Sequence, residues 1–229
     1  MIGKIIVANW KMNPASPREA KLLAAASKKT AATLLKTRTI ICPPAVYLPL
    51  LVPAKSSKKI FYGAQDIFAK SENEGAYTGE TSAKMIKNSG ADYSLIGHSE
   101  RRRAGETDRL VREKVQAAIK AGLKPILCVG EDKRDVHGEY LEVLRRQIGH
   151  CLGDLKKSYY GEIIIAYEPV WAVGVEAHAA DTPDNFFHNA LFIRKVFASL
   201  AGAEMARSLP VLYGGSVSVK NAEEFLKDG

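Results

Sequence analysis

The stretch Pro125-Ile126-Leu127-Cys128-Val129-Gly130 is a short and almost continuous apolar run, and a second run of this kind follows at 162–167. Between the two runs, apolar residues recur at helical spacing, at Leu141, Leu144, Ile148, Cys151 and Leu155. Apolar runs that do not alternate with polar residues are typical of strands covered on both faces, as in a parallel sheet. The stretch therefore predicts a strand, a helix and a second strand of an α/β fold.

The same pattern repeats along the whole chain. We predict seven strands, at Lys4–Asn9, Thr39–Cys42, Ile60–Gln65, Asp92–Gly97, Pro125–Gly130, Glu162–Tyr167 and Pro210–Tyr213. Two further amphipathic helices follow from apolar stripes, at Val111, Val115, Ala118 and Ile119 and at Phe186, Ala190, Ile193, Phe197 and Leu200. Ser16-Pro17-Arg18-Glu19 predicts the start of a helix, and Gly122 predicts the end of one.

Strict alternation of strands and helices predicts a parallel sheet with helical crossovers. Two architectures satisfy that pattern, a closed barrel and an open, doubly wound sheet. The first strand is not followed by a Gly-x-Gly-x-x-Gly turn, which weakens the dinucleotide-binding form of the open sheet. Seven strand–helix units can be identified, whereas a closed eight-fold barrel needs one more.

Composition bounds the class of protein. A chain of 229 residues with 46% hydrophobic residues is too apolar for a disordered protein, and three cysteines cannot form a disulfide scaffold of this length. No change of composition marks a linker, so we expect one domain over residues 1–229. No apolar run approaches the roughly 18 residues that cross a bilayer, and the first residues are too short for a secretory signal. We expect a soluble, cytoplasmic protein.

The net charge of +8 admits nucleic acid, an anionic membrane or an anionic small substrate as partner. The basic runs, such as Arg101-Arg102-Arg103, are short and scattered and contain no interleaved aromatic residues. We therefore interpret most of them as surface charge and expect neither a nucleic acid nor a membrane as partner. Cys128 lies within an apolar run, which indicates a buried thiol rather than a nucleophile or a metal ligand.

Polar residues collect where the predicted strands end, which is where parallel α/β proteins carry their functional groups. They are Asn9, Trp10, Lys11, Gln65, Asp66, His98, Ser99, Glu100, Arg101, Glu131, Glu168 and the loop Gly214-Gly215-Ser216. Each one has an ordinary structural explanation by itself. Together they offer a cation, an imidazole, a carboxylate and a glycine-rich loop, which suit proton transfer on an anionic substrate. The histidines follow no metal-ligand spacing, so we expect no metal.

Seven segments carry a resemblance to the triosephosphate isomerase family, in the order and near the spacing of that family. They are 8–13 (Ala-Asn-Trp-Lys-Met-Asn), 63–65, 77–80, 96–102 (Ile-Gly-His-Ser-Glu-Arg-Arg), 128–131, 166–174 (Ala-Tyr-Glu-Pro-Val-Trp-Ala-Val-Gly) and 213–217. The resemblance implies a TIM (β/α)8-type barrel that interconverts dihydroxyacetone phosphate and D-glyceraldehyde 3-phosphate in glycolysis and gluconeogenesis. It also implies a homodimer and no cofactor.

The resemblance also implies catalytic roles. Glu168 resembles the general base that moves a proton between the two substrate carbons, and His98 resembles the neutral electrophile that polarises the carbonyl. This division between a basic carboxylate and a neutral imidazole is the established description of the family and comes with the resemblance. Lys11 resembles the cation that supports charge on the substrate oxygen, and Asn9 places it.

Further residues resemble the family's binding and interface positions. Gly174 and Ser216 resemble backbone amide donors to the substrate phosphate, and Gly214 and Gly215 belong to the same phosphate loop. Glu100 resembles the family's neighbouring carboxylate, and Ser99 orients the site beside it. The loop Tyr77-Thr78-Gly79 resembles the one that inserts into the partner subunit.

The chain departs from the family pattern in two places. The family usually continues Gly-Thr-Gly-Lys-Thr-Ala after the Trp-Ala-Val segment, whereas residues 174–183 read Gly-Val-Glu-Ala-His-Ala-Ala-Asp-Thr-Pro. The segment that would form the eighth βα unit does not follow Gly229. These departures motivate an alternative, a catalytically impaired or non-catalytic scaffold of the same family. A sugar-phosphate epimerase is a third interpretation, disfavoured because those barrels lack this pair of motifs.

Overall fold

The computed structural model describes residues 3–34, 36–53, 60–70, 74–135, 137–172 and 181–227. The chain divides into two compact units. Unit 1 comprises Met1–Ile96 and Glu113–Pro125, and unit 2 comprises Gly97–Arg112 and Ile126–Gly229. The single domain expected over residues 1–229 stays a prediction.

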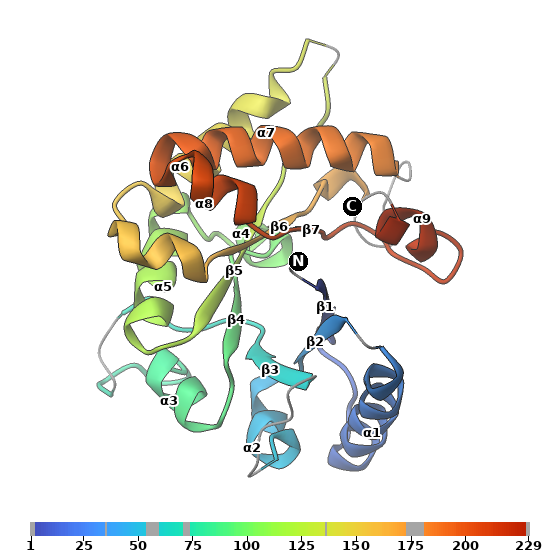
Figure 1. The fold of residues 1–229 in the computed structure, drawn as a ribbon. Helices are drawn as coiled ribbons and strands as arrows, with labels where there is room; N and C mark the ends of the chain where they lie inside the picture. Colours follow the sequence, from blue (N-terminus) through green and yellow to red (C-terminus); the bar gives the residue numbers. More distant parts are fainter. Residues whose placement is uncertain are drawn as a thin grey trace. The chain divides into compact units, whose positions relative to one another are not determined.

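Unit 1 is built on parallel strands that are neighbours in chain order (Figure 1). The strands are β1 (Lys4–Asn9), β2 (Thr37–Cys42), β3 (Ile60–Ala64) and β4 (Tyr93–Ile96). The helices are α1 (Pro17–Thr33), η1 (Ala45–Tyr47), α2 (Leu48–Leu51) and α3 (Ala83–Asn88). The register places Asn9 opposite Cys42 and Gly63 opposite Tyr93. The carboxyl ends of β1 and β2 therefore coincide, and the loops that follow them start side by side.

Unit 2 contains most of β5 (Lys124–Val129), together with β6 (Ile164–Tyr167) and β7 (Val211–Tyr213), again parallel and in chain order. Its other elements are α4 (Ser99–Arg103), α6 (Tyr140–Leu152), η2 (Lys157–Glu162), η3 (Val170–Ala172), α7 (Pro183–Ala201), α8 (Ala203–Ser208) and α9 (Ala222–Lys227). Helix α5 (Asp108–Lys120) begins in unit 2 and ends in unit 1. In the register of unit 2, Val129, Tyr167 and Tyr213 lie level at the carboxyl ends.

The seven predicted strands are confirmed within the described residues. Neither unit reverses its strand order, as a doubly wound sheet would at its switch point, so the order is that of a (β/α) barrel. Two strand starts are wrong by two residues: β2 begins at Thr37 rather than Thr39, and β6 begins only at Ile164 because Glu162 ends a 3₁₀ helix. The backbone N–H of Ile163 donates to the carbonyl of Tyr160, which keeps this backbone turned before the strand starts.

The predicted helix boundaries have the expected capping interactions. The hydroxyl of Ser16 accepts from the backbone N–H of Glu19 at 3.3 Å and donates to the Glu19 carboxylate at 2.8 Å, with Pro17 at the first helical position. At the other end of α5, Gly122 adopts a φ of +80°, and the next N–H, that of Leu123, donates to Ala118. A left-handed residue at this point is the usual way to terminate a helix.

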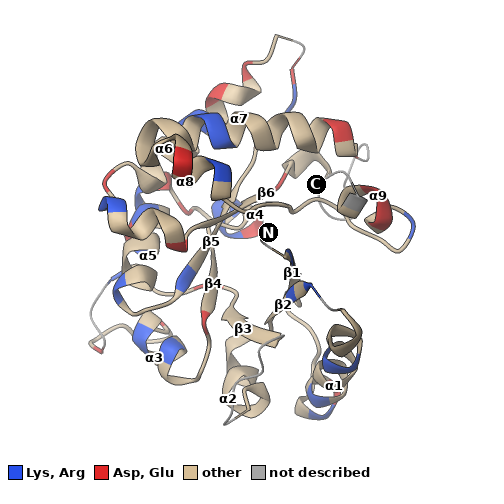
Figure 2. Ribbon diagram, in the orientation of Figure 1, with Lys and Arg blue, Asp and Glu red and all other residues tan. Residues whose placement is uncertain are grey.

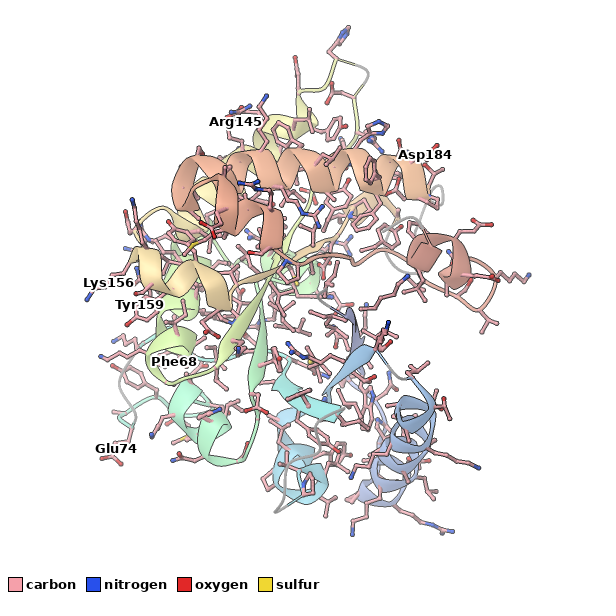
Figure 3. The ribbon with its side chains drawn as sticks, in the orientation of Figure 1. Phe68, Glu74, Arg145, Lys156, Tyr159 and Asp184 are labelled. Atoms are coloured by element: carbon pink, nitrogen blue, oxygen red, sulfur yellow. The ribbon has the colours of Figure 1, made fainter. Side chains whose placement is uncertain are left out.

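The predicted apolar stripes face inward. Leu144, Ile148 and Cys151 of α6 are fully buried, and so is Ile193 of α7, while Phe197 is 1% exposed. Helices α6 and α7 pack against each other, and Arg145 of α6 lies over the ring of Phe192 at 5.4 Å (Figure 3). Cys128 is buried and forms no disulfide, as its apolar surroundings predicted.

The charged residues spread over several elements. Lys and Arg occur on α1, α3, α5 and α7, and acidic residues begin α7 and α9 (Figure 2). Within the part of the chain that the structure describes, none of the helices is both long enough and apolar enough to span a bilayer.

Candidate active site

Glu168 follows β6 directly and is buried, with 6% of its surface exposed. Its main chain is fixed because its N–H donates to the carbonyl of Val129, the last residue of β5. Its carboxylate is held by α4, because the backbone N–H of Ser99 donates to Oε2 at 3.0 Å. A buried carboxylate that accepts a backbone N–H has a defined position from which it can take or deliver a proton.

Two glycines give the Glu168 segment its space. A Cβ on Gly130 would lie 1.8 Å from the backbone oxygen of Glu168, and a Cβ on Gly214 would lie 2.6 Å from its Cγ. The N–H of Gly214 also donates to the carbonyl of Tyr167 at 2.7 Å. The backbones after β5 and β7 can therefore approach this segment closely only because they carry no side chain there.

His98 lies beside Glu168 and is also buried, at 8% exposure. Its Nε2 is 3.6 Å from Oε1 of Glu168, and its Nδ1 accepts the backbone N–H of Glu100 at 3.2 Å. A nitrogen that accepts a hydrogen bond carries no proton, so the neutral ring has its N–H at Nε2. The group that can donate to a substrate oxygen is therefore the nitrogen nearer to Glu168.

Ser99 and Glu100 occupy the first turn of α4, after His98 at the N-cap. Ser99 contributes its backbone N–H to Glu168, while its buried side-chain Oγ has no hydrogen-bond partner. Glu100 has about half of its side chain exposed, and its Oε2 is 3.8 Å from Nδ1 of His98. Of this predicted pair, the structure therefore brings Ser99 into direct contact with Glu168.

Glu131 is fully buried and ties down both sides of the Glu168 segment. Its Oε1 accepts from the hydroxyl of Tyr167 at 2.9 Å and from the indole N–H of Trp171 at 2.8 Å. Its backbone oxygen accepts the N–H of Val170. Burial raises the pKa of Glu131, against the opposing effect of the Trp171 and Tyr167 hydrogen bonds and the positive charge of Arg134.

The predicted phosphate loop follows β7. Gly214 and Gly215 are half-buried and Ser216 is exposed. The backbone N–H of Ser216 donates to the carbonyl of Ala172 at 3.2 Å, so it can serve a phosphate only when this bond is released. Gly174 and the other residues of 173–180 lie outside the described residues.

Asn9 and Lys11 belong to unit 1, where a local network fixes the Lys11 main chain. The side chain of Asn9 accepts the N–H of Lys11 at 2.9 Å, and Nε2 of Gln65 donates to the carbonyls of Lys11 and Cys42 at 2.8 and 2.9 Å. Lys11 has a φ of +52°, which is unusual for a residue with a side chain. Such backbone persists only where surrounding contacts determine it, as these three hydrogen bonds do.

Sequence analysis missed a buried network behind α4. Arg102, interpreted as surface charge, donates to the carbonyl of Gly97 at 2.8 Å and to Asp108 at 2.6 Å. Burial alone would lower the pKa of Arg102, but its hydrogen bond to Asp108 and the nearby Cys151 and Asp108 charges raise it. Asn189 of α7 was also missed, although it donates to the Tyr167 hydroxyl at 3.0 Å. Its position on the buried helix face was the only available signal.

Metal binding has no support among the described residues, where no group of three or more His, Cys, Asp and Glu side chains is placed to hold an ion. The expectation that the protein needs no metal or cofactor stays a prediction. The chemical groups that the described site brings together are a buried carboxylate, an imidazole and hydrogen-bonding backbone N–H groups.

The sequence profile of the triosephosphate isomerase family matches residues 4–229. The chain belongs to the triosephosphate isomerase family. It is 41% identical over 228 residues to the triosephosphate isomerase of Natranaerobius thermophilus. The matched region covers 99% of this chain and 86% of that protein. It is 38% identical to the triosephosphate isomerase of Thermus thermophilus, over 97% of this chain and 87% of that protein. It is 40% identical to the triosephosphate isomerase of Porphyromonas gingivalis, over 98% of this chain and 88% of that protein.

Membership of the triosephosphate isomerase family confirms the fold class predicted from the sequence, a TIM (β/α)8-type barrel. The motifs that suggested the resemblance lie at strand ends in the structure, at Asn9, His98, Glu131, Glu168 and Gly214.

Proposed function

We propose that this chain is a triosephosphate isomerase that interconverts dihydroxyacetone phosphate and D-glyceraldehyde 3-phosphate. The observation that carries this assignment is the placement of Glu168, buried, held by the Ser99 N–H at 3.0 Å and 3.6 Å from Nε2 of His98. Relatives of the same name at 38–41% identity cover nearly the whole chain. The scaffold alternative is not favoured.

The proposed mechanism moves one proton between two carbons. The carboxylate of Glu168 removes a proton from the carbon beside the carbonyl, and the electron pair forms an enediolate as the carbonyl oxygen gains charge. The N–H at Nε2 of His98 donates to that oxygen and stabilises the charge. The hydroxyl proton of the deprotonated carbon then passes to this oxygen, with Nε2 of His98 placed to relay it. The protonated Glu168 returns its proton to the former carbonyl carbon while the other oxygen becomes the new carbonyl, so atoms and electrons balance without a cofactor.

The remaining residues have supporting roles in this proposal. Lys11 supplies the positive charge for the substrate, and Asn9 holds its main chain through the Lys11 N–H. The loop of Gly214, Gly215 and Ser216, with Gly174, binds the phosphate through backbone N–H groups, and Ser99 and Glu100 shape the site beside the base. A phosphate dianion suits this loop because backbone N–H groups satisfy its oxygens without adding charge.

We also propose a homodimer, formed through the loop Tyr77-Thr78-Gly79, and a cytoplasmic location. Tyr77 is held by the ring of Phe68 at 4.7 Å and by Lys70, whose Nζ donates to its hydroxyl at 2.7 Å (Figure 3 labels Phe68). Met12, on the loop after β1, is 93% exposed, and Val46 of η1 is 76% exposed; the Tyr47 hydroxyl of η1 donates to the carbonyl of Pro14 on that loop. Exposed apolar side chains of this size support an interface at this end of unit 1.

The test is isomerase turnover of the purified chain, coupled to a dehydrogenase, in wild type and Glu168→Gln. The amide keeps the size of the side chain and an oxygen for the Ser99 N–H but cannot act as a base. We expect kcat to fall by about 10²- to 10⁴-fold with the fold intact, the range that general-base catalysis supplies. Glu142→Gln on α6, at an exposed carboxylate, is the control for the loss of one charge. Full turnover in the Glu168 variant would refute the assigned role, and no turnover in folded wild type would refute the function.

A further inference from the structure

A buried chain of hydrogen bonds connects helix α7 to the segment that carries Glu168. Nδ2 of Asn189 donates to the Tyr167 hydroxyl at 3.0 Å, which donates to Oε1 of Glu131 at 2.9 Å, and the same oxygen accepts the Trp171 indole N–H at 2.8 Å. Asn189 and Glu131 are 1% and 0% exposed. Helix α7 packs against β6, which ends with Tyr167, so the first link joins two packed elements (Figure 1).

The direction of each hydrogen bond follows from the chemistry of the groups. An ionised carboxylate only accepts, so the single hydroxyl proton of Tyr167 points to Glu131. The Tyr167 oxygen is then an acceptor toward α7, and only the NH₂ group of Asn189 can meet it. Burial keeps the Tyr167 pKa raised, with the Glu131 charge adding to the effect, so this proton stays on the hydroxyl. The Glu131 carboxylate therefore sets the direction of the Tyr167 hydroxyl proton, and Asn189 supplies the donor that the Tyr167 oxygen then accepts.

This series of hydrogen bonds holds the segment 167–171 on both sides of Glu168. Tyr167 immediately precedes Glu168 and Trp171 comes three residues after it, and both donate to one oxygen of Glu131. Loss of either donor would leave this buried carboxylate with fewer hydrogen bonds, which is costly in an apolar interior. Two donors on one acceptor therefore fix the ends of the 167–171 segment relative to each other.

We propose that Asn189 is a positioning residue for Glu168, because its N–H donor holds the Tyr167 oxygen from α7 while the hydroxyl donates to Glu131, and so helps to fix the segment 167–171. Asn189 contacts neither of the proposed reacting groups and acts only through this chain. Within the described residues, Nδ2 of Asn189 donates to Tyr167 while its Oδ1 has no hydrogen-bond partner, so the contact that this side chain makes is the one through its donor. The proposal rests on the proposed isomerase function of the same site.

Asn189→Asp is the decisive variant, because it keeps the shape and replaces the donor with an acceptor. The introduced carboxylate competes with Glu131 for the Tyr167 proton. We expect kcat to fall by about 10- to 100-fold with little change in KM, as displacement of a catalytic group does. The indole N–H resonance of Trp171 should also move, in a ¹⁵N-tryptophan sample assigned with Trp171→Phe. Asn88→Asp, at an exposed site on α3, makes the same charge change and should alter neither quantity.

Two further variants keep the proposal open to refutation. In a Tyr167→Phe background the series of hydrogen bonds from Asn189 to Glu131 is already interrupted, so adding Asn189→Asp should move the Trp171 resonance no further. If Asn189→Asp does not fold, Asn189→Leu removes the donor without adding charge, and a smaller shift of the same sign with a drop in kcat is expected. An unchanged kcat and resonance in the folded variant, or additive effects with Tyr167→Phe, would overturn the proposal. The Trp171 indole resonance reports on this series of hydrogen bonds even if the wild type shows no isomerase turnover. Failure of the positioning proposal can therefore be distinguished from failure of the proposed isomerase function.

Discussion

The position of Glu168 depends both on a hydrogen bond from a neighbouring residue and on the absence of side chains at two neighbouring glycines. The Ser99 N–H fixes one carboxylate oxygen, while Gly130 and Gly214 leave room for the backbone and the Cγ. An added Cβ would lie 1.8 Å from the backbone oxygen of Glu168 at Gly130 and 2.6 Å from its Cγ at Gly214. Even a single methyl group at either glycine must therefore displace part of Glu168. At the residue scale, catalytic geometry is therefore set partly by the absence of side chains.

Gly214→Ala should separate catalysis from folding. The new Cβ meets the Glu168 side chain, which can rotate away, so we expect a folded protein whose kcat is lower by about 10- to 100-fold. Gly149→Ala is the matched control, since a Cβ there meets no atom within 4 Å and helix interiors prefer alanine. Steady-state kinetics and thermal unfolding of both variants test this. Equal kcat values in the two would show that Gly214 does not control the base.

The buried Glu131 should also leave a signature in the pH dependence of stability. Burial raises its pKa on folding above the ordinary value of a glutamate, so between that value and its folded pKa the native state binds more protons than the unfolded state. Stability from this group therefore falls as pH rises through that window. Glu131→Gln lacks this titration but keeps an acceptor for Tyr167 and Trp171.

Chemical unfolding of wild type and Glu131→Gln at several pH values from 4 upward measures the effect. We expect the free energy of unfolding of the variant, relative to wild type, to increase with pH in this range. A difference that stays constant across the range would show that Glu131 does not titrate differently in the folded state.

At the scale of elements, local capping chemistry and packing each determine different features. The start of α1 is fixed by Ser16, Pro17 and Glu19, all within one turn. The placement of α4 is fixed by contacts distant in sequence, since the Ser99 N–H donates to Glu168 and Arg102 donates to the carbonyl of Cys128 at 3.4 Å. Helix α1 is therefore encoded locally, while the turn that presents His98 and Ser99 depends on its surroundings.

Removal of the α1 cap should affect stability alone. Ser16→Ala loses the acceptor for the Glu19 N–H, and we expect about 1 kcal/mol lower free energy of unfolding with kcat unchanged. Ser16→Asp retains an acceptor at this position and should recover most of the loss. Urea unfolding and the coupled assay measure both quantities, and an unchanged stability in Ser16→Ala would contradict the capping role.

At the scale of the whole molecule, the proposed dimer is the assembly to test. Native mass by sedimentation should be twice the 25.0 kDa of the chain. Thr78→Arg adds a long charged side chain to the exposed loop at 77–79, and we expect it to shift the mass toward 25.0 kDa and to reduce turnover. Thr30→Arg on the exposed side of α1 makes the same change elsewhere and should remain dimeric. A monomeric wild type with full turnover would contradict the proposal.

The sequence by itself determined the seven strands, the amphipathic helices, the cap at Ser16 and the group of residues at strand ends that includes Glu168 and His98. These features depend on periodicity and on contacts a few residues apart, which sequence spacing records directly. Only the tertiary structure showed that Arg102 is part of a partly buried ion pair, that Gly130 and Gly214 make space for Glu168, and that Asn189 reaches Tyr167. These pairs lie between 6 and 46 positions apart, and a hydrogen bond or a close approach at such distances arises only when packing brings the strands and helices together.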